Sequence, residues 1–531
     1  MSEARYCLRA DVVAVPRIAQ WYAWTYLMSP ATAALYLANR YVRIMESYLD
    51  APELHAQALA NAAMRGGPFM DWPAARADEI AALLAHTRAR HAPQLAFAAA
   101  LGRCWEQLAQ HAHGYALADL YAELPQEVRG LVELVYTLGG APDLRVIEPL
   151  LYHCALYDPG AQSALVYRLD GDRRPFALST PQMMRPDAVL LEFPFASPVH
   201  DFLANLRDSP QPWDAIVAGL HLRGEQRERF RALVALQEPQ AAPRPRVAAR
   251  LETCRWRYFG HACVLLETPC GKSVLVDPVI AYDTAATPPR FTLADLPPRI
   301  DYVLLTHNHQ DHVLLETLLA LRPRIAHILV PAGGGSLADP SLKLALRAAG
   351  FDNVVELGAL DSVADGALRM TALPFLGEHA DLDIRTKAAW LVEAAGTRLL
   401  FAADSNNLEP QLYARLKPLI GHLHALFIGM ECEGAPLSWL YGPLLPAPLE
   451  HAKDQSRRLN GSDYRRAFNL LRSLDCEQVF VYALGLEPWL SFISSIEPDP
   501  NSAAMRSVRA LISACDELGI PAERLYGKAE S

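Results

Sequence analysis

Residues 304–312 of this 531-residue chain read LLTHNHQDH. The apolar run before His307 is typical of a buried strand, and a strand end is a rigid platform for the ligands in the loop that follows. His307 and His309 alternate by two and can face one metal ion, while Asp311 and His312 can reach a second. Imidazole and carboxylate ligands together suit zinc, iron or manganese. A loop of merely solvated residues is the weaker interpretation, because four such ligands within six positions are rare by chance. The stretch therefore predicts a dinuclear metal site.

Strand and helix patterns alternate on both sides of this stretch. Helical patterns such as DPSLKLALRAAGF and DYRRAFNLLRSL separate the apolar runs. This alternation indicates a layered α/β domain, which we assign to residues 253–531. The predicted strands lie within 254–268, 271–280, 301–307, 326–333, 353–358, 368–375, 387–404, 424–430 and 478–485.

The pattern H-x-H-x-D-H resembles the signature of the metallo-β-lactamase superfamily. Asp277, in LVDP, stands at the acidic turn that ends the superfamily's opening hairpin. Asp404, in RLLFAADSNN, stands at the strand end where the superfamily has a bridging aspartate. The resemblance covers about residues 253–500 and implies an α/β fold with a C-terminal αββα sandwich.

The first half of the chain has a different texture, rich in Ala, Leu and Arg. Helical periodicity over 77–112 and 122–140 predicts a mostly helical N-terminal domain at residues 1–238, and a β-like run at 188–195 predicts a minor sheet. The stretch 239–252 is interpreted as a proline-rich linker, because closely spaced prolines prevent a continuous helix. This half contains no metal-ligand spacing that points to chemistry.

Composition excludes several classes of protein. Hydrophobic residues make up 51% of the chain and charged residues 20%, as in a folded globular protein. The net charge of −10 argues against a general nucleic-acid binder. The nine cysteines form no C-x-x-C pair, which is typical of free thiols in a reducing compartment. We recognise neither a signal peptide nor an apolar stretch long enough for a membrane span, and so expect a cytoplasmic protein with no membrane contact.

Two departures from the superfamily's hydrolases concern histidines. Their first metal usually takes a third histidine, but the matching loop FLGEHAD offers Glu378 or His379. They also carry a late histidine, whereas the matching stretch VYALGLEPW offers only Glu487, and His451 is interpreted as an ordinary exposed residue. A carboxylate in place of an imidazole makes a site harder and favours iron over zinc. The missing histidine leaves open coordination positions, which oxygen activation at non-haem iron requires.

These features resemble a small family within the superfamily, the diiron β-hydroxylases of nonribosomal peptide and antibiotic biosynthesis. The resemblance extends over the whole chain. It implies an O2-dependent monooxygenase that hydroxylates the β-carbon of an amino acid. That amino acid is held as a thioester on the phosphopantetheine arm of a peptidyl carrier domain of a nonribosomal peptide synthetase. It further implies two iron ions, O2 as co-substrate, an external reductase as electron donor, and a homodimer formed through the N-terminal domain.

The resemblance also implies a set of six iron ligands. They are His307, His309, Asp311, His312, Glu378 and Asp404. Glu378 joins the first two histidines at one iron, the Asp-His pair of the motif holds the other, and Asp404 bridges them. Glu378 and Asp404 are therefore also the candidate catalytic residues.

Other residues are candidates for supporting roles. His379 would contact the ligands or the substrate, and His261 and Asp277 would hold ligands in place, although a satisfied core histidine is an equal interpretation for His261. Aromatic residues near strands are more often core than pocket wall. The candidate pocket aromatics are Trp439, Tyr441 and Trp489.

Two other functions fit the motif. A dizinc hydrolase such as a lactonase, thioesterase or nuclease shares it, although Glu378 and the missing late histidine count against this. A non-catalytic scaffold is disfavoured, because it would be expected to lose ligands.

An acidic enzyme that receives an acidic carrier domain needs a local basic surface. The alternative for each arginine in such a surface is a solvated face or an intrahelical pair. The candidates are Arg244, Arg246, Arg250, Arg457, Arg458, Arg465 and Arg466.

Overall fold

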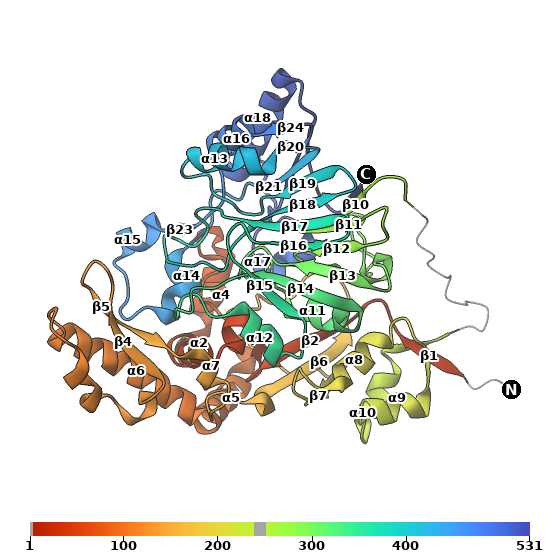
Figure 1. Ribbon diagram of the computed structural model, residues 1–531. Coiled ribbons are helices and arrows are strands. Elements are labelled where there is room, and N and C mark those ends of the chain that lie inside the picture. The colour runs from red at the N-terminus through yellow and green to blue at the C-terminus, as the bar shows by residue number, and fades with distance from the viewer. Residues whose placement is uncertain (1–3, 238–250) are drawn as a thin grey trace.

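The computed structural model describes residues 4–237 and 251–531 (Figure 1). The predicted linker over 239–252 therefore lies, apart from its last two residues, outside the described residues, and so do Arg244, Arg246 and Arg250. All nine cysteines are free thiols. No helix within the described ranges is long and apolar enough to cross a membrane.

Two seven-stranded sheets form the centre of the C-terminal half (Figure 1). The first sheet contains, in spatial order, β15 (Val354–Leu357), β14 (Ile325–Pro331), β13 (Ile300–Leu304), β12 (Ser273–Val276), β11 (Cys263–Glu267), β10 (Arg255–Gly260) and β27 (Ala529–Glu530). The second contains β16 (Ser362–Asp365), β17 (Leu368–Leu373), β18 (Ala389–Ala394), β19 (Thr397–Phe401), β21 (Ala425–Gly429), β25 (Val479–Tyr482) and β26 (Ala522–Arg524).

Helices cover both outer faces of the paired sheets. Between the sheets lies an apolar core that includes Trp390, Phe427 and Tyr482. α11 (Leu315–Leu321) and α12 (Leu342–Ala348) pack on the first sheet together with the N-terminal half. α13 (Gln411–Ile420), α16 (Tyr464–Ser473) and α18 (Ala503–Leu518) pack on the second. The layers confirm the predicted αββα sandwich.

Strand β13 leads directly into the metal motif. Its five residues are all buried, and it pairs in parallel with β12 on one side and β14 on the other. A parallel strand covered on both faces is expected to be almost continuously apolar, which explains the sequence IDYVL. The loop after β13 leaves the sheet at the carboxyl end of the strand, where ligand sites of such sheets lie.

The predicted strand over 254–268 is in fact two strands, β10 and β11. Gly260 and His261 both have positive φ, at 110° and 51°, and the pairing register shifts between Tyr258 and Gly260. A bulge of this kind turns the chain and re-aims a side chain. It brings His261 to the metal motif.

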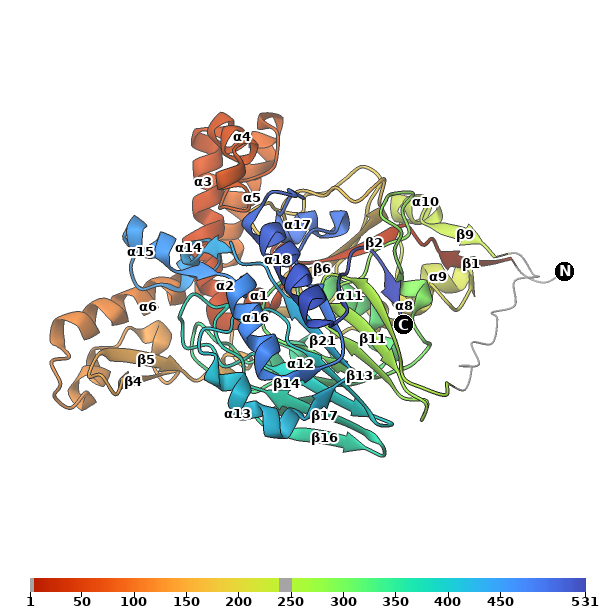
Figure 2. The ribbon, with the colours of Figure 1, turned by 90° about the horizontal axis from the view of Figure 1, so that it is seen from above.

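The N-terminal half is mostly helical, with strands in two small sheets and a hairpin. Its helices are α1 (Thr25–Met28), α2 (Pro30–Tyr36), α3 (Val42–Asp50), α4 (Pro52–Ala60), α5 (Ala77–Arg90), α6 (Ala92–His111), α7 (Glu148–Leu151), α8 (Pro198–Asn205), α9 (Trp213–Gly219) and α10 (Glu225–Arg231). The sheets are β3 (Trp21–Tyr22), β2 (Val12–Ile18), β6 (Gln162–Arg168) and β7 (Val189–Leu191), and β8 (Gln211–Pro212), β1 (Arg5–Leu8) and β9 (Val234–Leu236). Figure 2 shows α3 and α4, and separately α6 with its neighbouring hairpin, extending from the sandwich as two arms.

The helix predicted over 122–140 is wrong. The segment instead forms a short 3-10 turn at Gln126–Val128 and then β4 (Val132–Tyr136), which pairs with β5 (Pro142–Val146) as an antiparallel hairpin. In the run LVELVY, the buried side chains of Val132 and Leu134 alternate with the less buried Glu133 and Val135, as in a strand with one covered face. Gly130 and Gly140 have φ of 74° and 80° and interrupt any helix at both ends of the strand.

The two halves of the chain share one continuous apolar core. Residues of α1 and α2 belong to the same buried cluster as residues of β11, β13, α11 and α12. The hydroxyl of Tyr26 donates to the carbonyl of Ala338 at 2.7 Å, and the guanidinium of Arg174 pairs with Glu316 at 2.9 Å. The N-terminal half therefore supports the sheet that carries the metal motif.

Candidate metal centre

The first group of candidate ligands is His307, His309 and Glu378. One nitrogen or oxygen from each residue lies within 4.8 Å of the others, and all three residues are buried. His309 Nδ1 lies 3.1 Å from Glu378 Oε1. Glu378 has a φ of 69°, a conformation that non-glycine residues rarely adopt and that is often kept at functional sites.

The second group of candidate ligands consists of Asp404, His307 and His312. Asp404 Oδ2 is 3.1 Å from His312 Nε2 and 3.8 Å from His307 Nε2. Asp404 Oδ1 and His307 Nε2 are buried without a hydrogen-bond partner among the described residues. At Gly429 a Cβ atom would stand 2.5 Å from Asp404 Oδ1, so a glycine is needed for the carboxylate to take this position. The orphaned polar atoms fit a site built for a cation.

Asp311 lies next to His261 and His312 in a third group. His261 Nε2 is 3.3 Å from Asp311 Oδ2, while the Gly485 N–H donates to His261 Nδ1 at 3.2 Å. A neutral imidazole that accepts at Nδ1 carries its proton on Nε2. His261 therefore turns a protonated Nε2 towards the Asp311 carboxylate, without a hydrogen bond between the two, and has no free lone pair for a metal.

His312 is oriented by a fully buried carboxylate, Asp277. Asp277 Oδ2 lies 2.8 Å from His312 Nδ1. The same carboxylate accepts from the Thr306 N–H at 2.8 Å and from the Thr306 hydroxyl at 2.6 Å. This arrangement holds a proton on Nδ1, so Nε2, which faces Asp404, is the nitrogen that would bind a metal ion after losing its proton.

His379 lies behind His309, on the side away from Glu378. Its Nδ1 is 2.9 Å from His309 Nε2 and 3.0 Å from the Tyr441 hydroxyl. Tyr441 also contacts His309 Nε2 at 2.9 Å. Of the two competitors in FLGEHAD, the structure brings Glu378 to the other candidate ligands and sets His379 to hold His309.

Burial and charge prepare the ligands for a cation. Burial lowers the pKa of His309 to about 4 and, with the neighbouring histidines, lowers the pKa of His307 as well. Both imidazoles are thus neutral, the form that binds metal. Burial, followed by repulsion from Asp404 and Asp311, raises the pKa of Glu378. Burial opposes the charged form of His312, but Asp404 and Asp277 outweigh it and raise the pKa of that residue. Without a cation the carboxylates repel one another, and a metal ion removes that cost.

Several predicted residues lie elsewhere. Glu487 is buried and accepts a hydrogen bond from Tyr258. His451 is exposed at the start of α15 (His451–Ser456). The Trp489 ring packs on Gly260, so closely that a Cβ atom on Gly260 would lie 2.5 Å from the ring. It does not line the cavity beside the candidate ligands.

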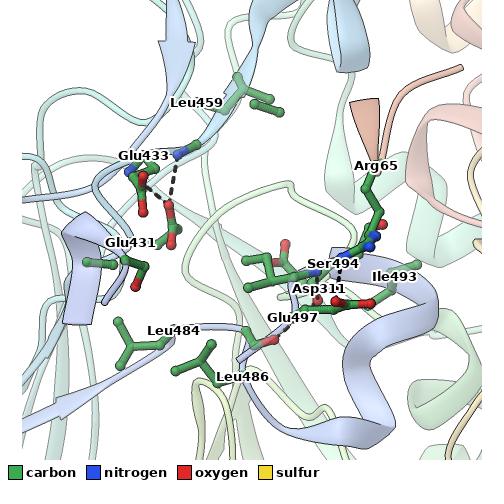
Figure 3. A pocket seen from close by; sticks show the side chains of 18 of the residues that line it. Arg65, Asp311, Glu431, Glu433, Leu459, Leu484, Leu486, Ile493, Ser494 and Glu497 are labelled. Atoms are coloured by element: carbon green, nitrogen blue, oxygen red, sulfur yellow. Dashed lines mark hydrogen bonds and ion pairs between the residues drawn. The ribbon is translucent and has the colours of Figure 1, made fainter. Parts of the chain in front are cut away.

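A cavity of about 600 Å³ opens onto the candidate ligands (Figure 3). His309, Asp311, Glu378 and Asp404 lie on its wall, and so does Trp439. The N-terminal half supplies another part of the wall, which consists of Ala62, Ala63, Arg65, Gly66, Phe176 and Leu178. No periodicity or motif in these residues points to such a role, so sequence reasoning missed them.

Two further contacts were missed because they depend on tertiary structure. The Thr25 hydroxyl, on α1, bonds the Asn308 side chain inside the metal motif. Lys387 donates to the carbonyl of Gly377 at 3.1 Å and so secures the loop that carries Glu378.

Comparison with known proteins extends over the whole chain. The family described as the diiron non-heme beta-hydroxylase N-terminal domain matches residues 7–239, and the beta-lactamase superfamily domain matches residues 272–424. The chain is 40% identical over 527 residues, or 98% of each protein, to 4-amino-L-phenylalanyl-[CmlP-peptidyl-carrier-protein] 3-hydroxylase of Streptomyces venezuelae.

Solved structures agree with this match. The crystal structure of CmlA, a diiron beta-hydroxylase from Streptomyces venezuelae, superposes with a TM-score of 0.91 at 39% identity and covers 100% of both chains. A shorter similarity links 124 residues, 23% of this chain, to 43% of a metal-dependent hydrolase of Anaeromyxobacter at 32% identity.

Proposed function

We propose a reaction for this chain, which belongs to the family of diiron non-heme beta-hydroxylases and is an oxygenase of that family. It hydroxylates the β-carbon of an amino acid that is tethered as a thioester to a peptidyl carrier domain of a nonribosomal peptide synthetase. The observation that carries the proposal is the position of Glu378, a carboxylate where hydrolases of the superfamily usually have a histidine. A harder donor set of this kind suits iron.

The donor set fits two iron ions. His307, His309 and Glu378 would hold one of them, as three buried donors with ligand atoms within 4.8 Å. The adjacent Asp-His pair of the motif would hold the other. Asp404 would bridge, because it faces histidines of both groups. When bound, the iron pair supplies O2 activation, with electrons from an external reductase.

The chain's own residues orient the ligands. Asp277 and Thr306 fix His312, His261 faces Asp311, and the pair of His379 and Tyr441 fixes His309. Each contact sets which ring nitrogen carries a proton and which faces the site. The cavity beside them holds the aminoacyl group and limits the access of water to the β-carbon.

The carrier partner agrees with the name of the relative, whose substrate is held on a peptidyl carrier protein. Three of the four described candidate arginines donate to acceptors on their own surface. Arg457 donates to the carbonyl of Ala380, Arg458 to that of Glu433, and Arg466 to the side chain of Asn406. Because these acceptors are neutral, they do not cancel the positive charges of the three arginines. The fourth, Arg465, is exposed to solvent. We therefore retain this group as a docking surface for an acidic carrier domain.

Three further features are part of the proposal. The enzyme acts as a homodimer through its N-terminal half, as the family resemblance implies. It works in the cytoplasm, where its cysteines stay reduced. Its electrons come from a separate reductase, since no flavin, nicotinamide or iron–sulfur motif is recognised in the sequence.

Anaerobic metal analysis, followed by O2 exposure with a panel of aminoacyl carrier proteins, tests the function. We expect two irons per chain and an oxygen atom from isotopically labelled O2 in the tethered amino acid, with no turnover of the free amino acid. Association should weaken as ionic strength rises, and Arg465→Glu should slow it without changing the spectrum of the iron site. Two zinc ions per chain with O2-independent hydrolysis would show a dizinc hydrolase instead.

A further inference from the structure

Glu431 stands on the cavity wall, just after strand β21 (Figure 3). Its backbone is held against the metal centre through Gly461, whose N–H donates to the Glu431 carbonyl at 2.6 Å. A Cβ atom on Gly461 would lie 3.3 Å from that carbonyl and 3.4 Å from the carbonyl of Asp404. The two acidic residues are therefore neighbours, although only Asp404 belongs to the ligand groups.

The carboxylate of Glu431 is fixed through one of its oxygens. Oε1 accepts from the N–H groups of Glu433 and Gly434, each at 2.8 Å. Within residues 4–237 and 251–531, no hydrogen bond or ion pair is made by Oε2. The side chain is thus preorganised, with one oxygen ready for a ligand in the cavity.

Three other carboxylates on the cavity wall, outside the candidate ligand groups, are also held through one oxygen. Glu497 pairs with Arg65 at 2.6 Å, Asp499 accepts from the Asn501 N–H at 2.8 Å, and Glu433 accepts from the Ala503 N–H at 3.0 Å. Glu431 differs from them because it is the one held beside Asp404 through Gly461. Arg458, a cation on the same wall, donates to backbone carbonyls rather than to Glu431.

The environment of Glu431 is unfavourable for a lone anion. Burial raises the pKa of Glu431, and the carboxylates of Glu433 and Asp404 add to the effect. A carboxylate in such a place is stabilised by a cation brought by a ligand.

We propose that Glu431 binds the α-ammonium group of the aminoacyl substrate and thereby directs its β-carbon to the metal centre. The inference rests on the proposed function, in which the reacting carbon is the β-carbon of an amino acid. The α-nitrogen and the β-carbon are bonded to the same atom and lie about 2.5 Å apart. The ammonium must therefore bind next to the metal ligands, and Glu431 is the carboxylate at that position with an oxygen to offer.

An ammonium site at Glu431 would make the enzyme select aminoacyl groups over acyl groups without an amine. An acyl group without the amine fills the same space but leaves the carboxylate unpaired, and sites built to pair a polar group reject analogues that lack it. The anion is matched to the α-amine, which is charged at neutral pH, and not to an aromatic ring amine, which is neutral there.

The test uses three stable probes in which an amide replaces the thioester of an acyl-pantetheine. Their affinities for the iron-loaded protein are measured by calorimetry. L-phenylalanyl-pantetheine carries the α-amine, 3-(4-aminophenyl)propanoyl-pantetheine carries a ring amine, and 3-phenylpropanoyl-pantetheine carries neither. Glu431→Gln keeps the size and the acceptor for the two N–H groups and removes the charge. Glu409→Gln is the matched control, because Glu409 is exposed outside the cavity and also accepts a backbone N–H, from Gln411 at 2.9 Å.

We expect the parent and Glu409→Gln to prefer the α-amine probe over the probe with neither amine by about tenfold or more. Glu431→Gln should lose this preference, bind the probe with neither amine as the parent does, and retain its iron. An α-amine preference that survives in Glu431→Gln would overturn the inference, and so would a Glu431-dependent preference for the ring amine alone. Neither result would alter the outcome of the experiment with the panel of aminoacyl carrier proteins, which tests the hydroxylase function separately.

Discussion

Replacement of Asp277 by asparagine tests whether the contacts behind His312 control metal binding. The amide has the shape of the carboxylate but only one acceptor oxygen, and its NH2 group faces donors. In the parent, three donors converge on the carboxylate, two from Thr306 and one from His312 Nδ1, at 2.6–2.8 Å. An amide that donates to Nδ1 moves the imidazole proton to Nε2, the atom that faces Asp404.

The size of the effect follows from the type of bond that is lost. Hydrogen bonds to charged groups are each worth about 1.5–3 kcal/mol, so the free energy of unfolding should fall by about that amount. Loss of a partner behind a metal-bound histidine typically lowers metal affinity about 10- to 100-fold, which corresponds to about 1.4–2.7 kcal/mol. Within the part of the chain that the structure describes, Asp277 contacts His312 directly and reaches His307 only through the Thr306 hydroxyl, which lies 3.0 Å from His307 Nδ1. The iron held by His312 should therefore weaken more than the other.

Asp301→Asn is the matched control for this experiment. Asp301 is also a buried carboxylate that joins β12 to β13, where it accepts from the Ser273 N–H at 3.0 Å and from the Ser273 hydroxyl at 3.2 Å. It lies at the opposite end of these strands from the metal motif. The control should lose stability and keep both irons.

Iron retention after dialysis against a graded chelator, together with Mössbauer spectra of the remaining iron, measures the outcome. We expect Asp277→Asn to retain about one iron per chain at a chelator concentration where Asp301→Asn retains two. Equal retention in the two variants would refute the idea that Asp277 sets the His312 proton.

Three other variants probe the site and the fold. Asp404→Ala should lose iron from both groups and all hydroxylation, whereas retention of two metals would mark Asp404 as a turn cap worth only about 1 kcal/mol. Glu378→His should shift the purified protein towards zinc and suppress O2 consumption, and undiminished hydroxylation with iron would redirect the ligand assignment to His379. Burial raises the pKa of Glu148 from 4.5 to about 6, so its contribution to stability is present below pH 4.5 and is lost as pH rises through about 6. The free energy of unfolding of Glu148→Gln should therefore exceed that of the parent by about 2 kcal/mol at neutral pH but not at pH 4.5. Urea titrations that give the same difference at both pH values would contradict this reasoning.

The sequence was most informative where function requires a local pattern. The candidate ligands of LLTHNHQDH follow one strand within six positions, so their grouping could be predicted without any tertiary contact. From the residues alone, Glu378 and His379 were equal candidates, because adjacent residues in a loop give no indication of which one points inward, and only the family resemblance favoured Glu378. The left-handed backbone at Glu378, with φ of 69°, accompanies the position of its carboxylate 3.1 Å from His309, and it has no signature in sequence.

Other features could not be predicted because they arise from packing. The helix predicted where β4 and β5 form a hairpin shows this, since a short apolar run fits both the helical and the strand period, and Gly130 and Gly140 decide between them. The position of Glu431 on the cavity wall could not be predicted, because a glutamate that follows a strand is common and the cavity itself has no sequence pattern. The wall formed by residues 62–66 comes from a segment far from the motif in the chain, and only the shared core of the two halves brings it there.

That shared wall has a consequence for how such enzymes can be recombined. The boundary between the two halves of the chain runs through the cavity beside the candidate ligands, with Arg65 on one side and Glu497 on the other, paired at 2.6 Å. A chimera that joins the first half of one family member to the second half of another would therefore inherit a binding chamber that neither parent possessed. Changing the acyl group that is accepted calls for transplanting both walls together, and a mutation in the half without metal ligands is an equally direct route to a new substrate.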